Sequence, residues 1–143
     1  MEKLLISACL LGVSCRYDGK SKPVPEAEKL MEKYELIPVC AEIMGGLPTP
    51  RVPAEIVGEK VITREGRDVT AEYLRGAGEV LRLAKLFGCK KALLKEKSPS
   101  CGRGRIYNGK FDGTLTDGYG KTAALLVENG IEVFGESQIN ELM

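Results

Sequence analysis

Short apolar runs, separated by polar segments, divide the chain into predicted strands. The first run, Lys3–Ala8, is continuous enough to form a strand that is buried on both faces of a sheet. Three later runs have the same character, and they predict strands at Glu35–Val39, Lys91–Leu94 and Glu132–Phe134. Two further segments have the pattern of small hairpins: Ile56–Ile62 with Gly58 in its turn, and Ile106–Phe111 around Asn108-Gly109.

The segments between the predicted strands place apolar residues at helical spacing. The pattern predicts three helices: one over residues 24–33, one from Asp68 or Thr70 to Phe87, and one from Thr116 or Asp117 to Asn129. Pro25 suits the first turn of its helix, where a missing N–H costs little. Gly88 ends the second helix, and one or two helical turns are expected at the end of the chain.

Strands that alternate with helices are typical of α/β proteins with a parallel sheet. We therefore expect a three-layer, Rossmann-like, mostly parallel sheet with helices on both faces and small hairpin insertions. No internal repeat or low-complexity segment interrupts the pattern, so residues 1–143 are expected to form one domain. The segment Ala41–Pro53 contains three prolines and two glycines, and it is predicted to be an irregular loop with apolar residues to pack.

Composition narrows the possible chemistry. The chain has no histidine, which excludes Ser-His-Asp and Cys-His catalysis and histidine-based zinc sites. A net charge of +1 creates no general attraction for nucleic acid or an anionic membrane. There is no apolar run long enough to span a bilayer and no signal-like amino terminus. Five cysteines without a secretory signal favour a reducing compartment, and we expect the cytoplasm.

Three cysteines follow three predicted strands. Cys9 and Cys40 come directly after the first and second strands, and Cys101 lies seven residues beyond Leu94. Ligands of open α/β sheets bind beyond the carboxyl ends of the strands, so these thiols are expected to converge at one edge. Converging thiolates without histidine favour zinc or an iron–sulfur cluster. With three protein ligands, one iron of a cluster keeps an open position.

The other two cysteines have different expected roles. Cys89 stands between a helix end and a strand start, at the opposite edge of the sheet, and is expected to be a buried structural thiol. Cys15 lies in the loop after the first strand. It is interpreted as a fourth ligand, a reactive thiol or a packing residue, and the sequence leaves these open.

Polar residues near the cysteines are candidates for catalysis. Glu42 stands two residues past Cys40 and is placed to transfer protons; its alternative interpretation is a solvated loop carboxylate. Ser98 and Ser100 either donate hydrogen bonds to a substrate or cap a helix. Four arginines are candidates for attracting an anionic ligand, although arginines are common on surfaces: Arg16, Arg51, Arg103 and Arg105. Lys95 and Glu96 are candidates for pairing with each other.

Three blocks of sequence resemble the thiouracil desulfidase family, long catalogued only as a domain of unknown function. The blocks are Ser7–Gly12 with Cys15–Gly19, Val39–Glu42 with Gly45–Arg51, and Lys95–Glu96 with Ser98–Gly102. The resemblance implies a 4Fe–4S cluster held by Cys9, Cys40 and Cys101, a catalytic carboxylate at Glu42 and a catalytic serine at Ser100 or Ser98. Many relatives have proline where this chain has Ala41, which would loosen the loop that holds Glu42.

The expected function is non-redox desulfuration of a thiolated pyrimidine nucleobase, with release of sulfide. The expected partner is this small molecule, and neither nucleic acid nor a membrane is expected to bind. Two other classes remain open: a non-catalytic module that binds a small anion or nucleotide at its glycine-rich loops, and an enzyme with a cysteine nucleophile. The Cys-x5-Arg phosphatase spacing is absent after each of the three strand-end cysteines.

Overall fold

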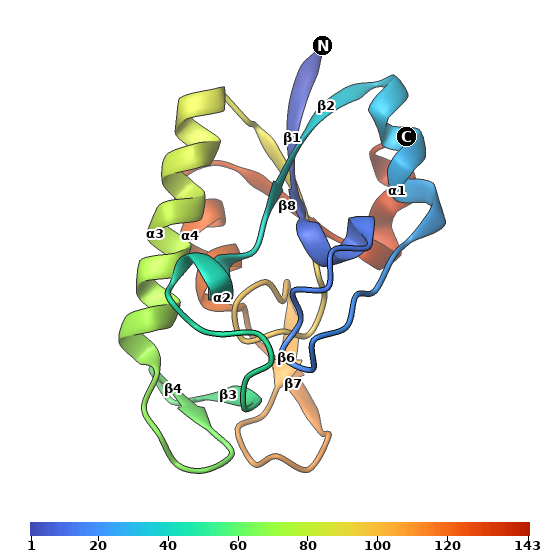
Figure 1. Cartoon of the computed structure of the whole chain (residues 1–143). Helices are drawn as coiled ribbons and strands as arrows, with labels where there is room; N and C mark the ends of the chain where they lie inside the picture. The colour runs from blue at the N-terminus through green and yellow to red at the C-terminus, as the bar shows by residue number, and fades with distance from the viewer.

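A four-stranded parallel sheet lies at the centre of the computed structural model, which describes residues 1–143 (Figure 1). Its strands stand in the order β2-β1-β5-β8, and every neighbouring pair is parallel. Their bounds are β1 Glu2–Ser7, β2 Tyr34–Val39, β5 Lys91–Leu94 and β8 Glu132–Gly135. The predicted α/β class and parallel sheet are confirmed. The chain changes direction across the sheet between β1 and β5, the position where such sheets bind ligands.

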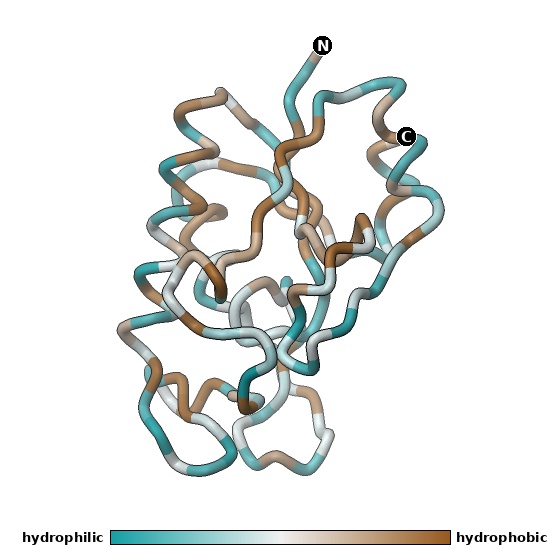
Figure 2. The backbone as a smooth tube through the Cα atoms, viewed as in Figure 1, coloured by the Kyte–Doolittle hydropathy of each residue, from teal (hydrophilic) through white to brown (hydrophobic).

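Helical segments cover both faces of the sheet, as predicted. On one face lie α1 (Pro25–Lys29), η2 (Leu30–Glu32) and η3 (Glu136–Glu141); on the other lie α3 (Thr70–Phe87) and α4 (Lys121–Glu128). Alternate residues of β1 enter the two cores, since Leu4 and Ile6 pack toward α1 whereas Leu5 packs toward α3 and α4. Figure 2 shows the apolar sheet enclosed between these layers. None of the helices combines the length and apolar character needed to span a membrane.

Two antiparallel hairpins lie beyond the carboxyl end of the sheet (Figure 1). One pairs β3 (Ala54–Val57) with β4 (Lys60–Thr63), and the other pairs β6 (Arg105–Tyr107) with β7 (Leu115–Asp117). The buried carboxylate of Glu55 joins them, because its Oε1 accepts hydrogen bonds from the backbone N–H groups of Gly109 (2.9 Å) and Phe111 (3.2 Å). The hairpins therefore form one unit below the sheet.

Two predicted boundaries in this region were wrong. The second hairpin does not turn tightly at Asn108-Gly109; its strands are joined by residues 108–114, because the N–H of Gly109 bonds to Glu55 instead of to a partner strand. The last helix was expected to begin at Thr116 or Asp117, but residues 115–117 pair with β6, and α4 begins at Lys121. Tertiary contacts outweighed a local turn preference in the first case and a local helix preference in the second.

A short helix, α2 (Ala41–Met44), stands where an irregular loop was predicted. It packs against α3 through two glycines, which let the two backbones touch. A Cβ added to Gly76 of α3 would lie 1.9 Å from the carbonyl oxygen of Ala41, and one added to Gly45 would lie 2.0 Å from that of Glu72. Only glycine fits at these two points, so they set how closely α2 approaches α3.

Candidate active site

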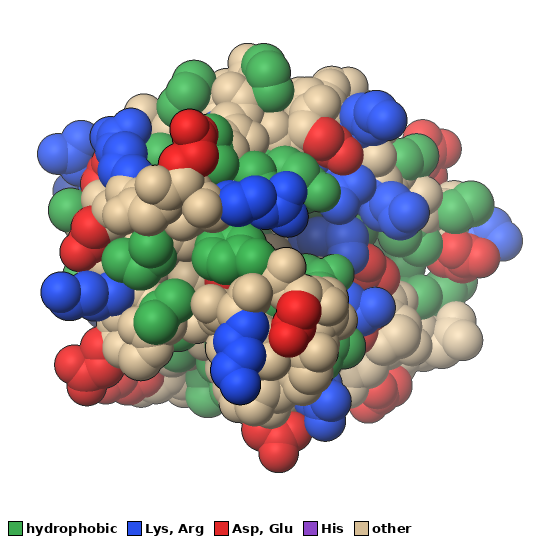
Figure 3. Space-filling view, turned by 90° about the horizontal axis from the view of Figure 1, so that it is seen from below, with side chains coloured by type: hydrophobic (Ala, Val, Ile, Leu, Met, Phe, Trp, Pro, Cys, Tyr) green, Lys and Arg blue, Asp and Glu red, His purple; other side chains and the backbone are tan.

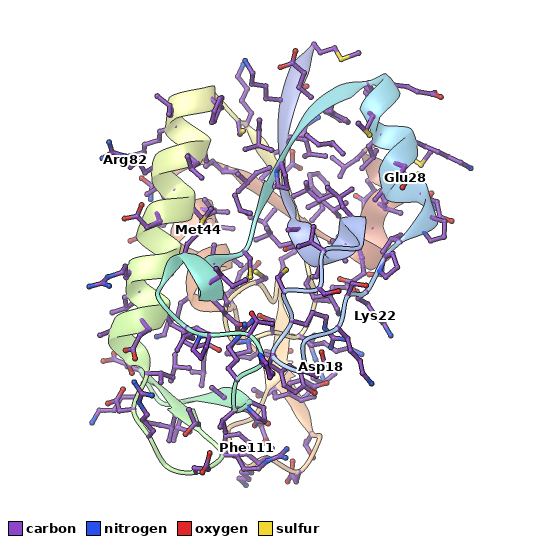
Figure 4. The ribbon with its side chains drawn as sticks, viewed as in Figure 1. Asp18, Lys22, Glu28, Met44, Arg82 and Phe111 are labelled. Carbon is purple, nitrogen blue, oxygen red and sulfur yellow. The ribbon has the colours of Figure 1, made fainter.

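A cavity of about 360 Å³ opens at the carboxyl edge of the sheet, between the strand ends and the two hairpins. It lies below the point where the strand order reverses between β1 and β5. Figure 3 looks onto this face and shows a hollow edged by hydrophobic and Lys or Arg side chains. Phe111, which Figure 4 labels, stands far from the sheet and forms part of the outer wall.

Four of the five cysteines line this cavity. Cys9 and Cys40 follow β1 and β2, Cys101 comes from the loop after β5, and Cys15 joins them from the loop after η1 (Ala8–Leu11). Figure 4 shows sulfur atoms grouped beside α2. Cys89 is instead buried in the core at the start of β5, as the sequence predicted. No cysteine forms a disulfide.

The cavity thiols interact with one another. The Cys40 thiol donates a hydrogen bond of 3.7 Å to the carbonyl oxygen of Cys15, and the Cys15 thiol, whose pKa is raised, lies near the thiols of Cys40 and Cys9. The hydrogen bond with Cys15, together with burial, raises the pKa of Cys40. Burial raises the pKa of Cys101 to about 12, although hydrogen bonds with the hydroxyls of Ser7 and Ser100 act in the opposite direction. The thiols of Cys40 and Cys101 are therefore protonated at neutral pH when no cation replaces their protons.

The arrangement fits an iron–sulfur cluster better than a single metal ion. No three His, Cys, Asp or Glu side chains are close enough to one point to hold a lone ion. A cluster binds its cysteine ligands on separate irons, so its ligands stand farther apart around a larger body. The donor set consists of soft sulfur atoms on three different strand ends, the ligand type that iron–sulfur clusters take. Cys9, Cys40 and Cys101 all line the cavity and fit this group.

Glu42 lies in the first turn of α2 and points into the cavity, where its side chain is 15% exposed. Both carboxylate oxygens have partners. Oε2 accepts hydrogen bonds from Arg51, with Nε at 2.9 Å and Nη2 also in contact. Oε1 accepts a hydrogen bond of 2.6 Å from the hydroxyl of Tyr73 on α3. The alternative of a freely solvated carboxylate does not describe this residue.

Arg51 binds groups within the protein and does not attract an anionic ligand, the role considered for it from the sequence. Its side chain is only 5% exposed, and all five of its guanidinium N–H groups have acceptors. Besides Glu42, these acceptors are the carbonyl oxygens of Cys15 (2.8 Å) and Pro48 (3.1 Å) and the hydroxyl of Thr49 (3.0 Å). No donor remains for an anionic ligand, so Arg51 holds three segments of the site together.

The remaining arginines fall into two groups. Arg16 lines the cavity and stacks over the ring of Tyr17, with 5.8 Å between its guanidinium carbon and the ring centre. Arg103 and Arg105 do not line it, and Arg105 pairs with Asp117 at 3.2 Å on the surface. Arg64, which the sequence did not suggest, also lines the cavity and stacks over Phe111 at 5.8 Å.

The two candidate serines have different surroundings. Ser98 lines the cavity, and its Oγ accepts hydrogen bonds of 2.9 Å from the backbone N–H groups of Ser100 and Cys101. Its own hydroxyl proton has no acceptor within the chain. Ser100 is 1% exposed, does not line the cavity, and places its Oγ 2.9 Å from Oγ1 of Thr122. Ser98 is therefore the serine that a ligand in the cavity can reach.

Three contacts at the site were not predicted. Lys95 pairs with Glu136 at 2.7 Å, not with the Glu96 carboxylate. Ser7 lines the cavity and accepts a 3.0 Å hydrogen bond from the N–H of Lys95. Tyr73 lies within the helix predicted from Asp68 or Thr70 to Phe87, and only its contact with Glu42 reveals a second role. Serine and tyrosine in buried elements carry no signal of their own in a sequence.

Comparisons with known proteins agree with this geometry. The model of the 2-thiouracil desulfurase family matches residues 4–138. The uncharacterized protein YbbK of Bacillus subtilis (strain 168) is 41% identical over 150 residues, which cover 98% of this chain and 99% of the relative. The solved structure of the 4Fe-4S-dependent thiouracil desulfidase TudS (DUF523Vcz) is similar with a TM-score of 0.95 and 53% identity, and the match covers 99% of this chain and 95% of that one. The chain belongs to the 2-thiouracil desulfurase family.

Proposed function

We propose that this protein is a 4Fe–4S-dependent desulfidase that converts a thiolated pyrimidine nucleobase to its oxo form and releases sulfide. The observation that carries the proposal is the meeting of Cys9, Cys40 and Cys101 with Glu42 in one cavity at the strand ends. Similarity to the 4Fe-4S-dependent thiouracil desulfidase TudS over nearly the whole chain supports it. The reaction needs no electrons, because water and the thiocarbonyl compound become a carbonyl compound and hydrogen sulfide.

Cys9, Cys40 and Cys101 are the residues that would hold the cluster. When bound through three cysteines, a 4Fe–4S cluster supplies an iron with an open position, which is a Lewis acid with affinity for sulfur. Cys15 stands beside two of these ligands, and its carbonyl oxygen is already bonded to Arg51. We assign Cys15 to shaping the loop after η1 and not to the ligand set.

The side chains of the cavity account for the proton transfers. Water adds to the carbon of the thiocarbonyl group, and Glu42 accepts the proton that the attacking water loses. As the carbon–sulfur bond breaks, the same carboxyl group returns this proton to the departing sulfur, and the hydroxyl of the adduct gives up its own proton as the carbonyl forms, so that hydrogen sulfide leaves. The free hydroxyl proton of Ser98 is placed to hydrogen-bond to a ring oxygen or nitrogen of the substrate. Ser100, bonded to Thr122, supports the loop that carries Cys101.

The walls of the cavity suit a small planar substrate. Tyr17, Tyr107 and Phe111 provide aromatic surface away from the sheet, where a nucleobase ring can stack. A volume of about 360 Å³ lies within the usual range for small-molecule sites. Five free thiols suit a reducing compartment, and we place the protein in the cytoplasm, working as one domain on a free small molecule.

Replacement of Glu42 by glutamine tests the assigned chemistry. Glutamine keeps the shape of the side chain but cannot accept a proton. With anaerobically reconstituted protein, we expect an unchanged iron content and sulfide release from 2-thiouracil or 4-thiouracil slower by about 10²–10⁴-fold. Wild-type protein with a full cluster that releases no sulfide from either compound would contradict the proposed function. Release by Glu42→Gln at the wild-type rate would contradict only the role of Glu42.

A further inference from the structure

We propose that Tyr73 and Arg51 are positioning residues that hold the two oxygens of Glu42 in fixed and unequal roles, which leaves Oε1 as the oxygen that exchanges the proton. The inference rests on the proposed function and adds two residues that the sequence did not assign to catalysis. It comes from the hydrogen bonds that the Glu42 carboxylate accepts from Arg51 and Tyr73.

The two oxygens of Glu42 differ in how many hydrogen-bond acceptor positions remain free. A carboxylate oxygen has two good acceptor positions. Arg51 uses both positions of Oε2, one through Nε and one through Nη2. Tyr73 uses one position of Oε1, at 2.6 Å, and the second position has no partner in the chain. Because Glu42 lines the cavity, that free position on Oε1 is the one that water or substrate can reach.

Arg51 can hold Oε2 rigidly because its guanidinium is itself held from every side. Its remaining donors bind the carbonyl oxygens of Cys15 and Pro48 and the hydroxyl of Thr49. Arginine has five donors in a planar fork, whereas lysine has three donors on a flexible stem. A lysine at this position would keep the positive charge but lose the paired contact with the carboxylate.

Tyr73 can direct Oε1 because its hydroxyl is buried and stays protonated. The residue is 4% exposed, and burial together with the charge of Glu42 raises the pKa of the phenol. Its helix, α3, touches α2 at Gly76, one turn beyond Tyr73. Since α2 carries Glu42, this contact fixes the distance between the hydroxyl and the carboxylate. The 2.6 Å hydrogen bond therefore joins two helices whose closest approach is set by Gly45 and Gly76.

The test is Tyr73→Phe, made in the wild-type chain and in Glu42→Gln. In the wild-type background we expect a full iron content, an unchanged KM for 2-thiouracil or 4-thiouracil, and kcat lower by roughly 10- to 100-fold, since a hydrogen bond to a charged group is lost. In the Glu42→Gln background the same change should alter kcat by less than about twofold, because Tyr73 acts through Glu42 and the effects of the two substitutions are not additive. Arg51→Lys should lower kcat by roughly tenfold or more, again with iron retained.

Tyr34→Phe is the matched control. Tyr34 is also a buried tyrosine, and its hydroxyl donates a 3.1 Å hydrogen bond to the carbonyl oxygen of Leu142, away from the cavity. Its loss should lower thermal stability about as much as Tyr73→Phe does and leave kcat unchanged. If Tyr73 had only a structural role, Tyr73→Phe and Tyr34→Phe would have similar effects on both thermal stability and kcat.

Thermal unfolding supplies a readout that does not depend on turnover. Tyr73→Phe and Glu42→Gln should lower the Tm of the cluster-loaded protein by less together than the sum of their separate effects. Tyr73→Phe with wild-type kcat, an equal fold loss in both backgrounds, or loss of iron from Tyr73→Phe would each overturn the inference. If the wild-type protein is inactive on both thiouracils, the proposed function is wrong. The contact between Tyr73 and Glu42 can still be tested by Tm in that case, and additive Tm shifts would contradict it.

Discussion

The contact between α2 and α3 gives a sharp test of how the fold places the site. Gly76 lies inside α3, where glycine is unfavourable for a helix, and we expect that it is needed because the Ala41 carbonyl touches it. Replacing Gly76 by alanine would put Cβ 1.9 Å from that oxygen. Gly78 lies two residues further along the same helix and has nothing within 4 Å of an added Cβ, so Gly78→Ala is the matched control.

The expected magnitudes follow from two opposing effects. Alanine is preferred to glycine within a helix by about 1 kcal/mol, so Gly78→Ala should stabilise the protein by about 0.5–1 kcal/mol. At Gly76 the same gain is opposed by overpacking, which costs about 1–3 kcal/mol. The clash is with backbone atoms that cannot rotate away, so the upper value applies and the net loss is about 2 kcal/mol. The two variants should then differ by about 3 kcal/mol, or by about 9 °C in Tm for a chain of this size.

Urea unfolding of the two variants, in reducing buffer and without cluster, measures this difference directly. A second readout comes from the reconstituted protein. Relief of the clash moves α2, which carries Glu42 and follows Cys40, so Gly76→Ala should also bind less iron and release sulfide more slowly than Gly78→Ala. If Gly76→Ala proves as stable as Gly78→Ala, the close approach of the two helices is wrong, and so is our account of how Glu42 is held.

Two further predictions concern the cysteines. Single changes of Cys9, Cys40 or Cys101 to alanine should abolish cluster incorporation, measured as iron and acid-labile sulfide. Cys89→Ala should keep the cluster, because Cys89 lies in the core at the other end of β5. Iron loss from Cys89→Ala alone would contradict this assignment. Cys15→Ala should keep its full iron content, because alanine preserves the carbonyl that binds Arg51; loss of iron on this change would make Cys15 a ligand.

The sequence by itself determined the sheet and the edge at which the site forms. Continuous apolar runs can only be buried between two helical layers, which is why β1, β2, β5 and β8 were predicted within a few residues of their observed bounds. A residue that directly follows a parallel strand must lie at its carboxyl end. That rule was enough to bring Cys9, Cys40 and Cys101 to one edge with Glu42 beside them, and the resemblance to a known family pointed to the same residues.

Tertiary structure alone decided how the site is held. Arg51 looked like one of several surface arginines, and only the fold showed that all five of its donors are used inside the protein. Tyr73 was one of several apolar positions within a predicted helix, a pattern that any partly buried helix shows. The approach of α2 to α3, through Gly76 and Ala41, joins residues 35 positions apart in the chain. Periodicity reports which face of an element is buried, but it carries no information about which distant group that face will meet.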